Sequence, residues 1–266
     1  MASLLPGIVA LLLYLAATLL LARRLLAQRG ERLPVILLGL AAVILHGLVL
    51  QEDIITANGI DLGFFTIFSL VTAIMVLVAL LGTLRAPIEN LGIGLMPLAA
   101  LALLLELLPL PGGHVMLRLG PVIEYHVVLS LLAFSLLGIA AFQAGLLAIQ
   151  DRHLRRHRAT GFIQVLPPLE TMERMLFQII VLGMICLSVA LLLGFIALDN
   201  MFAQHLVHKT VLSMLAWVIF AALLWGRYRY GWRGRLVVRW TLVGTVALVL
   251  AYFGTSLVLE LILGIR

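Results

Sequence analysis

The sequence predicts an all-α fold: a polytopic transmembrane bundle of eight helices with both termini outside the cytoplasm. Three observations lead to this prediction. Hydrophobic residues make up 64% of the 266 residues and charged residues only 11%, whereas a soluble domain is about half apolar and about a quarter charged. Apolar runs long enough to cross a bilayer recur along the whole chain. The basic residues gather on alternate connections between these runs, as they do in membrane proteins.

Each span is identified by length, because crossing the hydrocarbon core takes about 20 mostly apolar residues. Eight segments qualify, at about residues 4–22, 34–51, 62–84, 91–109, 122–149, 173–197, 208–226 and 239–262. The first segment has no basic residue before it and ends in Arg23 and Arg24. We therefore interpret it as a retained span and not as a cleaved signal peptide.

The connections are short, so we expect one transmembrane domain over residues 1–266 with no soluble domain attached. The longest connection, about residues 150–172, starts with DRHLRRHR, a basic extension of the fifth helix. Pro167 and Pro168 follow in GFIQVLPPLE. Proline interrupts a helix but fits its first turn, so this pair should end one helix and start the next.

The basic residues set the orientation. Fifteen of the 18 Lys and Arg fall on one side, which must be the cytoplasm. Only Arg118, Lys209 and Arg266 fall on the other side. Three basic and seven acidic residues outside give a charge of −4, and fifteen basic and five acidic residues inside give +10. An even number of spans then places both termini outside.

The composition excludes a soluble enzyme and a nucleic-acid binder. The net charge of +6 follows the membrane topology, so the bilayer is the expected partner and no nucleic acid is. No phosphate-binding loop, HExxH or GxSxG occurs, and we expect no enzymatic activity. The single cysteine, Cys186, cannot pair within the chain, and no CxxC or CxxCH is present. Thiol–disulfide exchange and covalent haem attachment are therefore not expected.

The seven histidines are the residues best suited to carry chemistry. His153 and His157 lie four residues apart among arginines, where a solvated surface is a better interpretation than a metal site. The other five map to the outer half: His46, His114, His126, His205 and His208. Neutral imidazole is a common metal ligand and the usual axial ligand of haem. A single interfacial histidine can simply bind a carbonyl, but ionisable groups in a membrane tend to mark functional sites.

Two of these histidines have the most informative surroundings. His126 opens the fifth span, with Glu124 two residues before it, and Glu124 is expected to hydrogen-bond the outer histidines and fix a tautomer. His208 is followed by Lys209 at the same depth. Trp217 lies in the middle of the seventh span, where packing between helices is favoured over contact with a cofactor.

Four segments together resemble one known family. They are LPPLETMERMLFQIIVLGMICLSVALLLG (166–194), HKTVLSMLAWVIFAALLWGRYRYGWRGR (208–235), LAYFGTSLVLELILG (250–264) and HVVLSLLAFSLLGIAAFQAGLLAIQDRHLR (126–155). With His46 and the later run DLGFFTIFSL, they resemble the cytochrome c assembly protein family, and more narrowly its small branch of HemX-like and YpjD-like inner-membrane proteins. The resemblance implies a multi-pass protein of the bacterial inner membrane with haem as its cofactor. It also implies that His126 takes the place of an outer haem-ligating histidine.

The sequence departs from the family pattern in three places. The Trp-Trp-Asp loop expected before the seventh span is replaced by MFAQHLVHK. Trp225 stands where the family often has a histidine at the cytoplasmic end of that span. No second outer histidine follows the last span. These departures put haem transfer, more than haem binding, in question.

The leading hypothesis is a non-enzymatic, haem-binding assembly factor that works with other cytochrome assembly components. His126 and His208 would ligate one iron from neighbouring spans across a mostly apolar slot, with His46 as substitute ligand. Lys209 or Arg118 would pair with the propionates. Two alternatives stay open. Outer acids next to the histidines favour a divalent-cation transport or resistance protein; these acids are Glu52, Asp53, Asp61, Glu106, Glu124 and Glu260. Small-residue helix faces favour a structural partner of a membrane complex.

Overall fold

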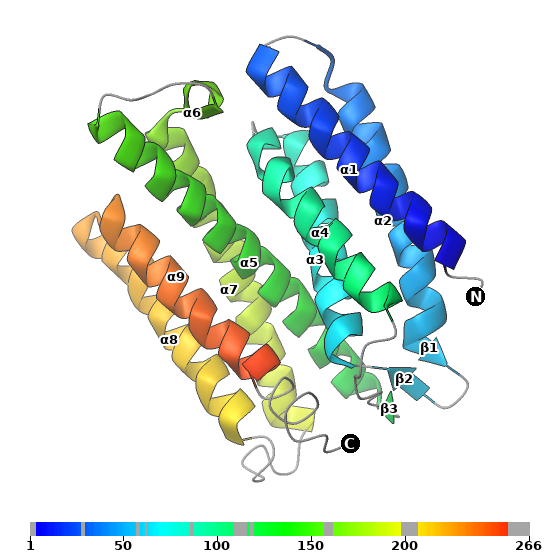
Figure 1. Cartoon of the computed structure of the whole chain (residues 1–266). Coiled ribbons are helices and arrows are strands. Elements are labelled where there is room, and N and C mark those ends of the chain that lie inside the picture. The colour runs from blue at the N-terminus through cyan, green and yellow to red at the C-terminus, as the bar shows by residue number, and fades with distance from the viewer. Residues whose placement is uncertain are drawn as a thin grey trace. The chain divides into compact units, whose positions relative to one another are not determined.

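A helix long and apolar enough to cross a membrane lies at each of the eight predicted spans in the computed structural model (Figure 1), the last over Arg235–Gly254, which confirms the all-α class. The structure describes residues 4–27, 30–56, 59–61, 63–85, 88–108, 116–117, 120–156, 162–197 and 207–254. Contacts divide the chain into two compact units. Unit 1 comprises residues 1–118, 160–166 and 264–266, and unit 2 comprises residues 119–159 and 167–263. The outer position of the termini and the single domain over 1–266 stay predictions.

Unit 1 is built from four long helices. They are α1 (Leu4–Ala27), α2 (Leu33–Ile54), α3 (Phe64–Thr83) and α4 (Gly92–Leu107), the last preceded by the 3₁₀ turn η1 (Glu89–Leu91). α1 packs against α2 and α4, and α3 packs against the same two helices. The short α6 (Phe162–Val165) contacts α1. Small residues allow the close approach: a side chain on Gly92 would come within 2.8 Å of Leu21.

A small antiparallel sheet belongs to unit 1 and was not predicted. Strand β1 (Ile55–Thr56) pairs with β2 (Gly59–Asp61), and β2 pairs with β3 (Met116–Leu117). It ties the connection after α2 to the connection after α4. Strands of two or three residues are too short to show an alternating hydrophobic pattern, so the sequence carried no signal for them.

Unit 2 contains the other four spans. They are α5 (Pro121–Arg155), α7 (Leu169–Ala197), α8 (Val207–Tyr230) and α9 (Arg235–Val249), and α9 continues as the π-helical turn η2 (Leu250–Gly254). α7 starts directly after the proline pair, where the Met172 amide donates to the Pro168 carbonyl, as predicted. α5 packs along α7 and α9, and α8 packs along α7 and α9.

Glycine sets the spacing of two helix pairs in unit 2. A side chain on Gly183 of α7 would lie 2.8 Å from Leu137 of α5. One on Gly244 of α9 would lie 2.8 Å from the Phe220 ring of α8. Interfaces between membrane helices gain stability from such close packing, because lipid provides no hydrophobic drive for helices to associate.

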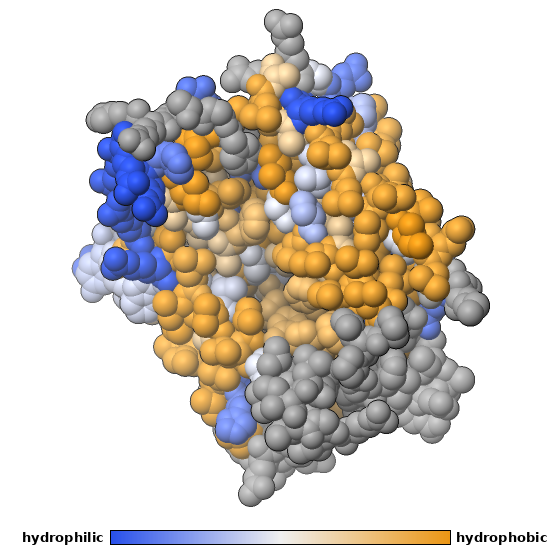
Figure 2. All heavy atoms as spheres, in the orientation of Figure 1, coloured by the Kyte–Doolittle hydropathy of each residue, from blue (hydrophilic) through white to orange (hydrophobic). Residues whose placement is uncertain are grey.

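The helices expose apolar side chains that a soluble protein would bury. Leu5 of α1 is 75% exposed and Ile196 of α7 is 76% exposed. Apolar atoms cover most of the described helical surface in Figure 2, with hydrophilic groups towards helix ends. Such surface is stable against lipid and not against water, so these helices cross a membrane.

Candidate functional site

One cavity of unit 2 is lined by every long helix of that unit, and we call it the His126 cavity. Its lining residues are His126, Val127, Ser130 and Phe134 of α5; Leu187, Ala190 and Leu191 of α7; Lys209, Thr210 and Ser213 of α8; and Leu248, Ala251 and Tyr252 of α9 and η2. The cavity has a volume of about 170 Å³. Its walls are mainly apolar and carry a few polar groups, which is the usual character of a cofactor site.

Of the described residues that line this cavity, His126 is the one whose side chain is of a common metal-binding type. α5 begins at Pro121 after the N-cap Gly120, so His126 lies in the second turn of the helix and is half-buried. Its Nδ1 lies 2.7 Å from the carbonyl oxygen of Ala190 on α7. A carbonyl only accepts, so Nδ1 carries the proton and donates it. Nε2 then keeps its lone pair, and no described residue hydrogen-bonds to it.

This hydrogen bond changes the expected role of Glu124. The Glu124 carboxylate is exposed and has no hydrogen bond with a described residue. The backbone of α7 orients the imidazole instead. A backbone carbonyl on the non-ligating nitrogen of a histidine is a common arrangement behind metal-binding imidazoles, because it fixes the tautomer and the ring plane.

Lys209 provides the positive charge of the cavity wall. Its ammonium nitrogen lies 5.8 Å from the centre of the Tyr252 ring, close enough for a cation–π contact. Tyr252 belongs to the π-helical turn η2, and its ring also lies 6.1 Å from that of Phe134. π-Helical turns are rare overall, and those that occur are often found at functional sites. Here the turn supplies Ala251 and Tyr252 to the wall.

His208 directly precedes Lys209 in α8 but does not line the cavity with it. The His208 side chain is exposed. Adjacent residues of a helix point about 100° apart, so the rotation that brings Lys209 to the cavity turns His208 away from it. The pairing of His126 with His208 on one iron stays a prediction. Trp217 is 37% exposed, and its indole N–H donates to the Ser188 hydroxyl of α7 at 2.8 Å, so it lies at the outer edge of the contact between α8 and α7, in line with the predicted packing role.

His46 belongs to unit 1, where it is completely buried. Its Nδ1 lies 3.2 Å from the Tyr14 hydroxyl and its Nε2 lies 2.8 Å from the Ser69 hydroxyl. Tyr14 and Ser69 are completely buried as well, on α1 and α3. Both ring nitrogens are engaged, so His46 can bind a metal only by giving up one of these hydrogen bonds.

Several other predicted residues lie outside the described residues. They are His114, His157, His205 and Arg118. Within the part of the chain that the structure describes, no three His, Cys, Asp or Glu side chains form a group that could hold a metal ion. The described residues therefore bring no ready-made cation site together.

The polar residues that complete the cavity were missed from sequence. Ser130 and Ser213 were not predicted, because isolated serines are common in membrane helices. One signal could have found Ser130: His126, Ser130 and Phe134 follow at intervals of four and so share one helix face. The Ala190 carbonyl has no sequence signal, since every residue carries one.

The family comparison extends over almost all of both units. Residues 34–263 match the model of the family described as "Cytochrome C assembly protein". The chain belongs to the cytochrome c assembly protein family. It is 33% identical to the inner membrane protein YpjD of Escherichia coli K12 over 263 residues, which covers 96% of this chain and 98% of YpjD. It is also 31% identical to an uncharacterised 28.8 kDa protein of Azospirillum brasilense over 144 residues, 53% of each chain. No solved structure matches.

Membership of this family, the likeness to YpjD and the eight apolar helices make the chain a multi-pass protein of the bacterial inner membrane. They also connect it with cytochrome c maturation. The predicted resemblance is thus confirmed. The matched region contains all four predicted site residues, which are His46, His126, His208 and Lys209.

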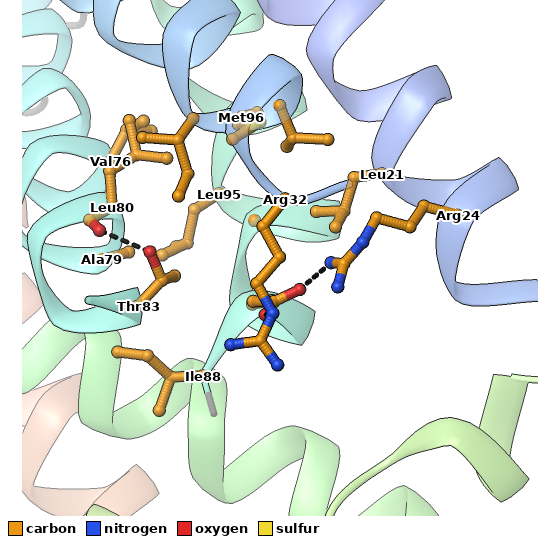
Figure 3. Close-up of a pocket in the computed structure, with 14 residues that line it drawn as sticks. Leu21, Arg24, Arg32, Val76, Ala79, Leu80, Thr83, Ile88, Leu95 and Met96 are labelled. Atoms are coloured by element: carbon orange, nitrogen blue, oxygen red, sulfur yellow. Dashed lines mark hydrogen bonds and ion pairs between the residues drawn. The ribbon is translucent and has the colours of Figure 1, made fainter. Parts of the chain in front are cut away.

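A second, smaller cavity of this family member lies in unit 1 and has a structural explanation. Its volume is about 20 Å³, and most of its lining residues are apolar residues of α1 to α4. Arg24 and Arg32 approach it from the ends of α1 and α2 (Figure 3). Both form ion pairs with Glu89, which is 13% exposed. This carboxylate ties three helix ends together, so we assign the cluster to stability.

Proposed function

We propose that this protein binds haem at the His126 cavity and assists the assembly of cytochrome c or of other haem proteins without catalysing a reaction. Membership of the family supports a role in maturation, and the cavity supports the choice of haem. Haem would supply an iron with open axial positions, to which a neutral imidazole can bind.

The observation that carries this proposal is the hydrogen bond from His126 Nδ1 to the Ala190 carbonyl. It leaves Nε2 as the basic nitrogen and holds the ring in one plane before any ligand arrives. An axial ligand needs both properties. The cavity is about 170 Å³ and is smaller than the roughly 300–1,000 Å³ of sites that enclose whole ligands. A macrocycle bound to His126 would therefore protrude from it.

Lys209 is the proposed partner of a propionate. Its ammonium group is held beside the Tyr252 ring at the wall of the same cavity. A carboxylate that met it there would form an ion pair in surroundings poor in water, where such pairs are stronger than at an aqueous surface. Ser130, Thr210 and Ser213 offer hydroxyl groups to a bound carboxylate or to ordered water.

We keep His208 as the predicted second axial ligand; its side chain is exposed and does not line the cavity, so it would bind the iron where the macrocycle protrudes. His46 is the substitute ligand. Its two hydrogen bonds, to Tyr14 and Ser69, make it the poorer candidate, since ligation would leave a buried hydroxyl without its partner.

Haem titration of the full-length protein in detergent tests the proposal. The wild type should show a Soret band shifted from that of free haem. His126→Ala should weaken haem binding at least about tenfold, the smaller end of the effect of disturbing a metal site. His153→Ala is the matched control, because His153 lies on the same helix and also donates from Nδ1 to a carbonyl, that of Ile149 at 2.8 Å. It should bind haem as the wild type does.

Two further variants locate the site. Ser213→Leu places a larger side chain in the cavity without touching His126, and should also weaken haem binding. His208→Ala should change the low-spin spectrum if His208 is the second ligand. Protein that takes up no haem, or that takes it up equally well in wild type and His126→Ala, overturns the assignment. The cation and structural-partner alternatives would then be tested by metal uptake and by co-purification.

A further inference from the structure

A second candidate ligand site lies at the end of unit 2 opposite the His126 cavity, in a groove that we call the basic groove. It lies where α5 ends, α7 begins and α9 begins, and has a volume of about 460 Å³. Its lining residues are Leu147, Ala148, Asp151, Arg152, Arg155 and Arg156 of α5 and its C-cap; Leu169 and Glu173 of α7; and Gly234, Arg235, Val238 and Arg239 around the start of α9. Strongly hydrophilic atoms gather at this end of α5 and α9 in Figure 2.

The groove has a surplus of positive charge. Five guanidinium groups and two carboxylates line it, which leaves a net charge of +3. Glu173 is already used, because it accepts from Arg227 at 2.7 Å and from the Gly234 amide at 3.0 Å. The guanidinium groups of Arg152, Arg156 and Arg239 have no ion pair or hydrogen bond with another described residue. An anion entering the groove would therefore not have to displace a described partner of these three.

Asp151 positions two more arginines of the groove, Arg155 and Arg235, to bind an anion. Its carboxylate accepts from Nε of Arg155 at 2.9 Å and from Nε of Arg235 at 3.2 Å. In both arginines the contact uses Nε, so the terminal nitrogens are not used by Asp151. Guanidinium groups bind phosphate oxygens with paired N–H donors. Asp151 thus holds two of these donor pairs side by side across α5 and α9.

The floor of the groove is apolar. Leu147, Ala148, Leu169 and Val238 line it together with the arginines. α5 has 35 residues and is about 52 Å long, whereas the hydrocarbon core is about 30 Å thick. Its basic end therefore lies near the headgroups. Trp232 and Trp240, whose rings are 5.5 Å apart, flank the start of α9 as interfacial tryptophans do. A basic rim above an apolar floor at this depth fits a phospholipid better than a free anion.

We propose that the basic groove binds the phosphate of an anionic phospholipid headgroup, with an acyl chain against the apolar floor. Basic pockets between membrane helices on the cytoplasmic side are suited to such headgroups. The proposal concerns the cytoplasmic end of unit 2 and is independent of haem binding at His126.

The test measures binding of short-chain phosphatidylglycerol to the full-length protein in neutral detergent, with phosphatidylcholine and inorganic phosphate as comparison probes. Phosphatidylglycerol should bind and stabilise the protein, and phosphatidylcholine should bind much more weakly. Arg152→Gln with Arg239→Gln should reduce phosphatidylglycerol binding about 25-fold, at about fivefold for each arginine. Arg233→Gln is the matched control, since Arg233 is exposed on the same side but does not line the groove. It should change binding less than about twofold.

Each other outcome overturns the proposal. Equal binding of the two lipids, or an unchanged affinity in the double variant, means that the arginines recognise no headgroup. Inorganic phosphate that binds through the same arginines and displaces phosphatidylglycerol at similar concentration means that the ligand is a free anion. If the double variant does not fold, Arg156→Gln replaces it, because the Arg156 side chain is exposed and has no described partner to lose.

Discussion

Replacing His46 should destabilise unit 1 more than any change at a lipid-facing position of the same helix. Hydrogen bonds between membrane helices contribute about 0.6 kcal/mol on average and up to about 1.7 kcal/mol. His46→Ala removes two of them, one to Tyr14 and one to Ser69. It also leaves a space in a site that is 0% exposed. We expect the free energy of unfolding to fall by about 2–4 kcal/mol, since a buried hydroxyl left unpaired costs about 1–3 kcal/mol.

The single hydrogen bonds can be measured separately. Tyr14→Phe removes only the hydroxyl that meets Nδ1, and Ser69→Ala removes only the one that meets Nε2. Each should cost about 0.6–1.7 kcal/mol. A neutral imidazole has one donor and one acceptor nitrogen, so the two hydroxyls take opposite roles. Losing one hydroxyl frees the ring to change tautomer. The destabilisation of the Tyr14→Phe/Ser69→Ala double variant should therefore differ from the sum of the two single effects by about 0.5 kcal/mol or more.

The assay is reversible unfolding of the full-length protein in mixed micelles, followed by helix content. Ile44→Ala is the control, because Ile44 lies on α2 two residues from His46 and is 63% exposed. It should change the free energy of unfolding by no more than about 0.5 kcal/mol. If His46→Ala is no more destabilising than this control, then His46 is not held by the buried hydroxyls, and its role as a substitute ligand would gain weight.

Two further predictions concern packing and topology. Gly183→Ala should destabilise the protein by about 1–3 kcal/mol in thermal unfolding, because the new methyl would lie 2.8 Å from Leu137. Gly145→Ala is the control: its methyl would enter open space, so this variant should be neutral or stabilising. A stable Gly183→Ala would show that α5 and α7 separate easily. Reporter fusions at Arg156 and Arg233 should both report the cytoplasm, and a periplasmic signal from either would contradict the orientation derived from the basic residues.

The positions of the helices along the chain followed from the sequence, with some limits off by about four residues, because the bilayer acts on each segment by itself. Every apolar run of sufficient length must become a helix, since lipid offers no partner for backbone N–H and C=O groups. The start of α7 after Pro168 follows from proline chemistry, and the predicted cytoplasmic connections follow from the charges. His126 was also found from sequence, as a titratable residue at the start of a long apolar span, and the structure places it on the wall of a cavity.

The rotation of each helix about its axis was decided only by tertiary structure. In a soluble protein the polar face of a helix shows which side is inside, but here both the lipid face and the packed face are apolar. The sequence therefore could not tell that Lys209 lines the cavity and His208 does not, although the two are neighbours. Nor could it supply the Ala190 carbonyl for His126, or Tyr14 and Ser69 for His46. These partners come from other helices, and only packing brings them within hydrogen-bond distance.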